Sequence, residues 1–85
     1  MKKTQEKDIT KPVDLALIDP PDGHVRLEIP ERQIFELSES MKEIGLIQAI
    51  LITPVNKRYE VVVGHRRYLA AKRLKWDKIK AEIRK

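Results

Sequence analysis

The 85-residue sequence contains no cysteine, and this absence excludes several classes of protein. Without thiols there is no disulfide, no thiolate metal site and no cysteine nucleophile. Aromatic residues make up only 5% of the chain, too few to predict a surface of rings on which nucleic-acid bases stack. Long apolar runs are missing as well, so the sequence predicts neither a signal peptide nor a membrane span. We therefore expect a cytoplasmic protein with no membrane partner.

The rest of the composition is typical of one small globular domain with a heavily charged surface. Hydrophobic residues account for 41% and charged residues for 36%, with a net charge of +5 at pH 7. The positive charge lies near the C-terminus: residues 64–85 hold nine basic against two acidic residues, a net +7, while residues 1–63 hold nine against eleven, a net −2. This bias favours a phosphate-bearing or nucleic-acid partner, and a solvated basic helix is the alternative.

Hydrophobic periodicity predicts an α+β fold, a small mixed β-sheet with two main helices in the order β-α-β-β-α-β. The domain is expected over residues 11–85, after a polar, aperiodic segment (1–10) typical of a flexible tail. The expected strands cover residues 13–18, 50–53, 59–63 and 79–83, and the expected helices cover 31–44 and 65–75. The first helix carries one apolar stripe made of Ile34, Leu37, Met41 and Ile44, and Gly45 is placed to end it with a left-handed backbone.

The segment Gly64-His65-Arg66-Arg67 joins a β-rich run to the second helix. Glycine lets a backbone approach a ligand closely, and the first turn of a helix has free N–H groups and a positive dipole end. Arginine is unfavourable at that end unless an anion compensates it. Two arginines there indicate a phosphate-type ligand, and two solvent-facing arginines are the alternative.

Two further segments hold candidate binding residues. Gln48 is the one polar side chain in the apolar run 45–50, and a buried glutamine needs a partner, either a ligand or nearby backbone. Arg26 lies in a loop before the first helix and is placed to close over an anion, although a lone loop arginine is commonly solvated. Tyr68 and Trp76 are more typical of core or edge residues than of base-stacking platforms.

Catalytic signals are weak. The sequence has only two histidines, His24 and His65, which do not make a metal site without several carboxylates, so no metal ligands are predicted. It has no phosphate-binding loop of the Gly-x-x-x-x-Gly-Lys-Ser/Thr type. Catalytic residues stay unassigned.

Two boxes resemble the ParB N-terminal domain family, in the superfamily that also includes sulfiredoxin. Residues 37–50 are similar to the box L-x-E-L-A-x-S-I-x-x-x-G-L-x-Q-P-I, and residues 59–71 to the box Y-x-I-x-x-G-E-R-R-x-x-A-A. The loop 20–26 is similar to the segment that precedes the first box, and the resemblance covers residues 12–84.

The resemblance implies a nucleotide-binding domain in a DNA-partition setting. In partition proteins the second box holds the triphosphate of CTP with magnesium, and in sulfiredoxins it holds ATP. Carried over by position, the implied phosphate-binding residues are Gly64, His65, Arg66, Arg67 and Arg26, and the implied pocket residues are Gly45, Ile47 and Gln48. Magnesium would accompany the nucleotide.

Departures from the family pattern limit what is implied. His65 stands where partition proteins have glutamate and sulfiredoxins their catalytic cysteine, which excludes sulfiredoxin activity and leaves metal coordination and nucleotide hydrolysis open. Ala49 replaces the usual proline. The helix-turn-helix and dimerisation domains of full partition proteins are not among these 85 residues, so sequence-specific DNA reading is not implied.

Two alternatives remain. One is a module that binds DNA without reading its sequence, or a related nuclease-like module. The other is a phosphoryl-transfer enzyme of the same fold, for which Glu28 and Glu31 are the nearest carboxylates in the sequence.

Overall fold

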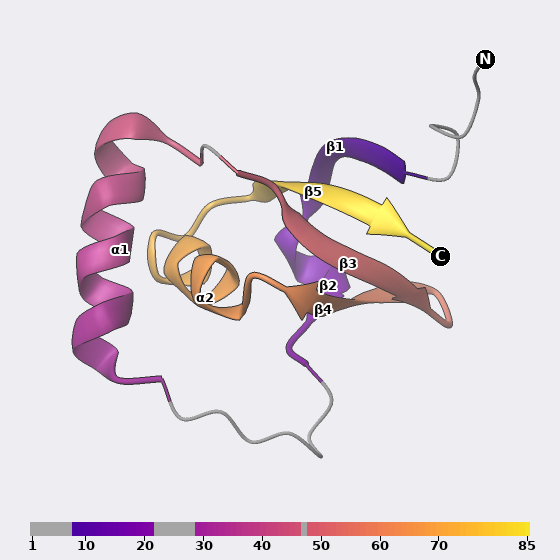
Figure 1. Cartoon of the computed structure of the whole chain (residues 1–85), viewed down its shortest axis with the longest axis horizontal. Coiled ribbons are helices and arrows are strands. Elements are labelled where there is room, and N and C mark those ends of the chain that lie inside the picture. Colours follow the sequence, from indigo (N-terminus) through magenta and orange to yellow (C-terminus); the bar gives the residue numbers. More distant parts are fainter. Residues whose placement is uncertain (1–7, 22–28, 47) are drawn as a thin grey trace.

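The computed structural model describes residues 8–21, 29–46 and 48–85, and it confirms a mixed α+β fold with two helices and one sheet (Figure 1). In chain order the elements are β1 (Asp8–Asp14), a 3-10 turn (Leu15–Leu17), β2 (Ile18–Asp19), α1 (Glu31–Ile44), β3 (Ile50–Val55), β4 (Arg58–Val63), α2 (His65–Arg73) and β5 (Lys78–Arg84).

The sheet has five strands in the order β1-β5-β3-β4-β2 and mixes both pairing types. Strands β1 and β5, and strands β3 and β4, are antiparallel, whereas β3 pairs with β5 and β2 with β4 in parallel. The β3–β4 hairpin turns at Asn56, whose φ of 59° is the left-handed backbone that asparagine tolerates better than most residues. The resulting sheet brings the end of β4, and therefore the start of α2, next to β3.

Helix α2 lies between the sheet and α1 (Figure 1). Its Ala70 and Ala71 are fully buried, and small side chains at these positions let the helix approach its neighbours closely. Tyr68 is also buried, and its hydroxyl donates a hydrogen bond to the carbonyl of Ile18 in β2, 3.1 Å away. The rest of the buried apolar core comes from all five strands, α1 and the 3-10 turn: Val13, Leu15, Ile18, Ile34, Met41, Ile50, Ile52, Val61, Ile79, Ala81 and Ile83. No described helix is long and apolar enough to cross a membrane.

The first strand differs from the prediction. The residues 13–18 do not form one strand: β1 ends at Asp14, a 3-10 turn follows, and β2 contains only Ile18 and Asp19. The break has a clear cause, since the N–H of Leu15 donates to the carbonyl of Asp77 at 2.9 Å and the chain then crosses from one edge of the sheet to the other. Strand β1 also begins at Asp8, inside the segment for which we predicted a tail, because Asp8 pairs in register with Arg84.

Both helices follow their predicted positions with local differences. Helix α1 buries Ile34, Ser38 and Met41, whereas Ile44, placed by the sequence in the apolar stripe, is 63% exposed. Ser38 is tolerated in the interior because its hydroxyl donates to the carbonyl of Phe35 at 2.7 Å. Helix α2 ends at Arg73 instead of Lys75, since Lys75 has a φ of 60° that no α-helix contains.

Candidate functional site

The start of α2 has the geometry of an anion-binding helix terminus. Gly64 is the N-cap residue, and its carbonyl accepts the first helical hydrogen bond from the N–H of Tyr68 at 2.9 Å. The N–H groups of His65, Arg66 and Arg67 precede that bond and have no acceptor within the helix. These donors and the positive end of the helix dipole point the same way, and together they favour an anion as the ligand.

An open cleft of about 780 Å³ lies at this helix start. One wall is the β4–α2 junction, which includes all four residues of the predicted Gly64-His65-Arg66-Arg67 segment. The other wall comes from the chain entering α1 and the first half of that helix. The lining residues are Ile29, Pro30, Gln33, Leu37, Val63, Gly64, His65, Arg66 and Arg67.

Arg67 connects this cleft to the second segment that the sequence singled out. Its Nη2 donates a hydrogen bond to Oε1 of Gln48 at 3.0 Å, across 19 positions of sequence. Arg67 and Gln48 also line a neighbouring cavity of about 300 Å³ together with Gly45. Gln48 is exposed, contrary to the buried glutamine that its apolar neighbours suggested. Of the other predicted site residues, Arg26 and Ile47 lie outside the described residues.

His65 has one atom without a partner. Its Nδ1 is buried, and no residue in the described part of the chain forms a hydrogen bond with it. The ring lies near Tyr68, with centroids 6.4 Å apart and planes tilted by 30°. His65 lines the cleft as a residue, but its buried Nδ1 is not exposed to it.

Gly64 has a packing role that the sequence did not reveal. Its φ of 104° strongly favours glycine, and a Cβ at this position would lie 2.7 Å from Cγ2 and 2.9 Å from Cβ of Ile50. The missing side chain therefore lets β4 and α2 join directly against β3. This close contact holds the first turn of α2 beside the strand that follows Gln48.

The wall supplied by α1 was also not predicted. Gln33 and Leu37 line the cleft from one face of α1, because they are four positions apart. This spacing is the sequence signal that could have placed them on the same side of the helix. Glu31, one of two carboxylates near the predicted pocket, instead pairs with Arg73 of α2, and it does not line the cleft. The other carboxylate, Glu28, lies outside the described residues.

The described lining does not fit a protein-held magnesium ion. Mg²⁺ in proteins is bound through one or two carboxylates together with substrate phosphates. None of the nine residues that line the cleft is acidic. No group of three or more His, Cys, Asp or Glu side chains elsewhere in the described ranges is placed to hold a metal ion. The cleft offers donors and positive charge, which suit an anion.

Solved structures define the class of fold to which this site belongs. The ParB of Caulobacter crescentus, truncated at its C-terminus and complexed with CTP-gamma-S, has a TM-score of 0.81 and 25% identity, covering 89% of this chain and 44% of that one. Sulfiredoxin from Arabidopsis thaliana has a TM-score of 0.78 and 28% identity, covering 91% of this chain and 85% of that one. The chain therefore has the fold shared by ParB and sulfiredoxin.

Within that class, the sequence model of the ParB N-terminal domain matches residues 1–85, and the chain belongs to this family. The probable chromosome-partitioning protein ParB of Borreliella burgdorferi is 36% identical over 64 residues, which are 75% of this chain and 25% of that protein. The nucleoid occlusion protein of Geobacillus kaustophilus is 31% identical over 85 residues, 99% of this chain and 30% of that protein. The chain thus spans between a quarter and a third of the length of these two relatives.

Proposed function

We propose that the cleft binds a nucleoside di- or triphosphate, with its phosphates at the start of α2. The observation that carries this proposal is the convergence at Arg67, which joins the helix start to Gln48 and lines both neighbouring cavities. Arg66 and Arg67 supply charge and paired donors for phosphate oxygens, and the free N–H groups of the first turn add neutral donors. His65 lines the same cleft beside these donors.

A nucleotide of the CTP type is favoured over one of the ATP type. The Caulobacter ParB structure with CTP-gamma-S covers most of this chain at a high TM-score, and sequence relatives are chromosome-partitioning and nucleoid occlusion proteins. We propose that the chain also works in chromosome partitioning or nucleoid occlusion, in the bacterial cytoplasm. Binding is the proposed activity, and no residue is assigned a role in hydrolysis.

Any magnesium would enter with the nucleotide. Since the described lining has no carboxylate, the ion would be held by phosphate oxygens and water, and the arginines would neutralise most of the phosphate charge. We therefore expect nucleotide binding to weaken only modestly when magnesium is removed with EDTA.

The proposal is tested by thermal unfolding with CTP, ATP, GTP and ADP, each with magnesium or with EDTA. A ligand at about 100 times its Kd stabilises the native state by roughly 2.7 kcal/mol, a rise in Tm of about 10 °C or more in a domain of this size. Arg66→Ala combined with Arg67→Ala should abolish the rise. The fold should persist, because removing positive charge from a helix N-terminus is not destabilising.

The matched control is Lys11→Ala combined with Lys80→Ala, which removes the same charge from exposed positions on β1 and β5. This control should keep the full rise in Tm. A rise that survives the arginine substitutions, or no rise with any of the four nucleotides, would overturn the proposal.

Sequence-independent DNA contact is a second candidate, favoured by the net +7 charge of residues 64–85. A further Caulobacter crescentus ParB structure, complexed to the centromeric parS site, matches this chain with a TM-score of 0.75. Its identity of 23% supports the fold only. DNA contact by this chain is therefore proposed from charge.

A further inference from the structure

We propose that a second pocket, separate from the nucleotide cleft, binds a phosphoryl group. This pocket, called here the Lys72 pocket, has a volume of about 360 Å³ and lies where β2, β4 and the C-terminal end of α2 meet. Its lining is Leu15, Ala16, Ile18, Asp19, Pro20, Arg58, Tyr68, Lys72, Lys75 and Trp76, and none of these residues lines the cleft or its neighbouring cavity. The inference therefore does not depend on nucleotide binding at the start of α2.

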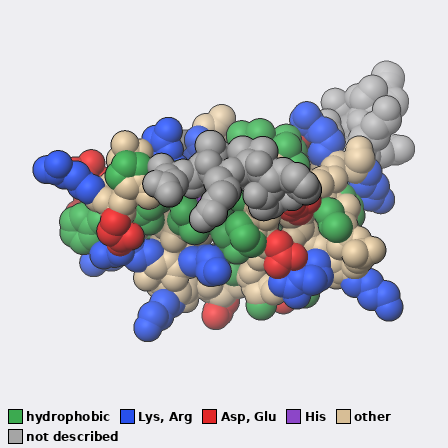
Figure 2. All heavy atoms as spheres, turned by 90° about the horizontal axis from the view of Figure 1, so that it is seen from below, with side chains coloured by type: hydrophobic (Ala, Val, Ile, Leu, Met, Phe, Trp, Pro, Cys, Tyr) green, Lys and Arg blue, Asp and Glu red, His purple; other side chains and the backbone are tan. Residues whose placement is uncertain are grey.

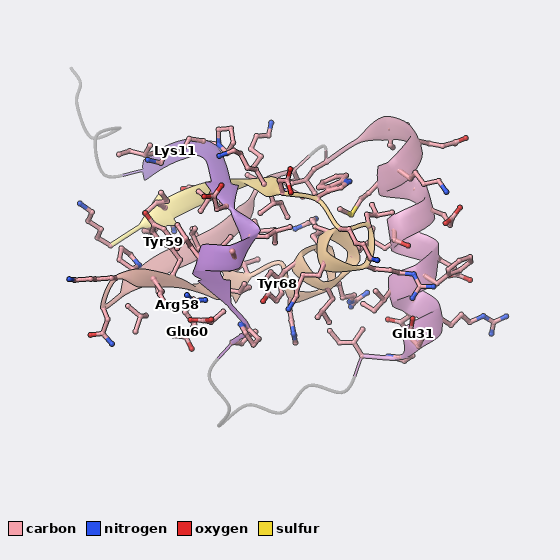
Figure 3. The ribbon with its side chains drawn as sticks, turned by 180° about the vertical axis from the view of Figure 1, so that it is seen from behind. Lys11, Glu31, Arg58, Tyr59, Glu60 and Tyr68 are labelled. Atoms are coloured by element: carbon pink, nitrogen blue, oxygen red, sulfur yellow. The ribbon has the colours of Figure 1, made fainter. Side chains whose placement is uncertain are left out.

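Arg58 is held in position as a fixed donor. Its Nε and Nη2 donate to the two carboxylate oxygens of Asp19 at 3.0 and 2.9 Å, and Nη2 also donates to the carbonyl of Ala16 at 2.8 Å. In Figure 3, Arg58 lies beside β2 and Tyr68 projects from α2 toward the same end of the sheet. The remaining terminal nitrogen, Nη1, has no hydrogen-bond partner among the described residues, so a preorganised guanidinium donor is left for a ligand.

The two lysines of the pocket bring positive charge that no close ion pair compensates. Nζ of Lys72 lies 5.3 Å from the centroid of the Tyr68 ring, and neither Lys72 nor Lys75 forms an ion pair within the described ranges. Three cationic side chains thus face a single carboxylate, that of Asp19. The pocket has a net charge of +2, which favours a compact dianion such as a phosphoryl group.

A simpler explanation accounts for only part of this arrangement. Basic residues near the end of a helix compensate its negative dipole end, and Lys72 alone would be explained in that way. Arg58 comes from β4, however, and Lys75 follows the helix with a left-handed φ of 60°. Dipole compensation does not account for Arg58, whereas cations that converge from two elements fit an anion site.

The chain offers a direct reporter for this pocket. Trp76 lines it and is the single tryptophan of the sequence, so intrinsic tryptophan fluorescence reports on the surroundings of the Lys72 pocket. The probes are pyrophosphate, for a free phosphoryl ligand, and an oligothymidylate of about eight residues, for a backbone phosphate. A saturable change with either probe supports the proposal, and the tighter of the two identifies the source of the phosphoryl group.

Lys72→Gln combined with Lys75→Gln should weaken this response about tenfold or more, because both unpaired charges are lost while the exposed side chains stay similar in length. Lys11→Gln combined with Lys80→Gln makes the same change in net charge away from the pocket and should leave the apparent Kd within about twofold. Far-UV circular dichroism and Tm confirm that each variant is folded.

Three outcomes would overturn the proposal. The first is the lack of a saturable fluorescence change with either probe, and the second is an equal weakening of probe binding in the two double lysine variants. The third is loss of the fluorescence response in the Arg66→Ala, Arg67→Ala variant. The last would assign the signal to the nucleotide cleft. Failure of nucleotide binding with an intact Trp76 response would leave the Lys72 pocket supported, so the two proposals are tested separately.

Discussion

Two features of the structure require glycine at position 64, a positive φ and the lack of space for a Cβ, and the sequence reveals them only in part. The position of Gly64 before two arginines marks the helix start, but the reason for glycine lies across the sheet, where the side chain of Ile50 occupies the space that a Cβ would need. Gly45, at the end of α1, also has a positive φ, of 77°, yet nothing lies within 4 Å of its ideal Cβ position. Comparing alanine substitutions at the two glycines therefore separates the free-energy cost of a strained backbone from the free-energy cost of steric overlap.

Alanine substitution at these two positions gives the first prediction. Gly45→Ala should cost about 1–3 kcal/mol of unfolding free energy, because only the backbone is strained. Gly64→Ala should cost about 1–3 kcal/mol more, since Ile50 and the new methyl group overlap. Urea denaturation of both variants measures the difference. Equal losses would contradict a packing role for Gly64, and a change in m-value would show either that the denatured or native state changed in compactness or that two-state unfolding was lost.

The candidate site could be predicted from the sequence where its signal is local. Gly64, Arg66 and Arg67 lie within four consecutive positions, and the order strand, glycine, arginine, helix carries its own physical meaning. The hydrogen bond from Arg67 to Gln48 joins two segments brought together only by the β3–β4 hairpin, and no local pattern encodes it. The overlap at Ile50 is hidden for the same reason.

At the scale of elements, the strands and helices with a clear apolar period were predicted close to their observed bounds. The edge strands were not, because each depends on a partner far along the chain. Strand β1 alternates weakly and is specified by its pairing with β5, and β2 has only two residues. Besides its short pairing with β4, two side-chain contacts hold β2: Arg58 bonds to Asp19, and Tyr68 bonds to the carbonyl of Ile18.

Acid should weaken this attachment of β2. The hydrogen bonds from Arg58 hold the pKa of the Asp19 carboxyl below its ordinary value of 3.8. A lowered pKa in the folded state means that the ion pair contributes stability above the ordinary value, and that this contribution is lost as the pH falls through the folded-state pKa. The Tm of the wild type should therefore exceed that of Asp19→Asn near pH 6, and the difference should shrink toward about pH 2.

The control for this pH series is Glu43→Gln on α1, because Glu43 is exposed and forms no ion pair within the described ranges. Its Tm difference from the wild type should stay small over the same interval. A constant difference between wild type and Asp19→Asn at every pH would show that the Arg58–Asp19 pair does not link β2 to stability.

For the whole molecule, the uneven charge of the sequence is partly redistributed by folding. The basic residues of 64–85 include Arg73, which pairs with Glu31, and Lys78, whose Nζ lies 2.8 Å from Asp14. Figure 2 shows Lys and Arg side chains spread over the face in view, with acidic side chains between them. A basic segment that is partly compensated by N-terminal acids can attract DNA, but such a surface does not select a sequence.

This charge distribution predicts how the chain should bind duplex DNA. Binding should be weak, equal on a centromeric parS duplex and a scrambled duplex of the same length, and steeply reduced by salt, because phosphate contacts release counterions with a slope of roughly −0.9 per contact. Helix α2 lies between α1 and the sheet, so it is not free to enter a groove. Fluorescence anisotropy at about 50 and 200 mM salt measures both properties. Preference for parS above about tenfold, or binding unaffected by salt, would contradict the charge-based contact and show that the chain itself reads bases.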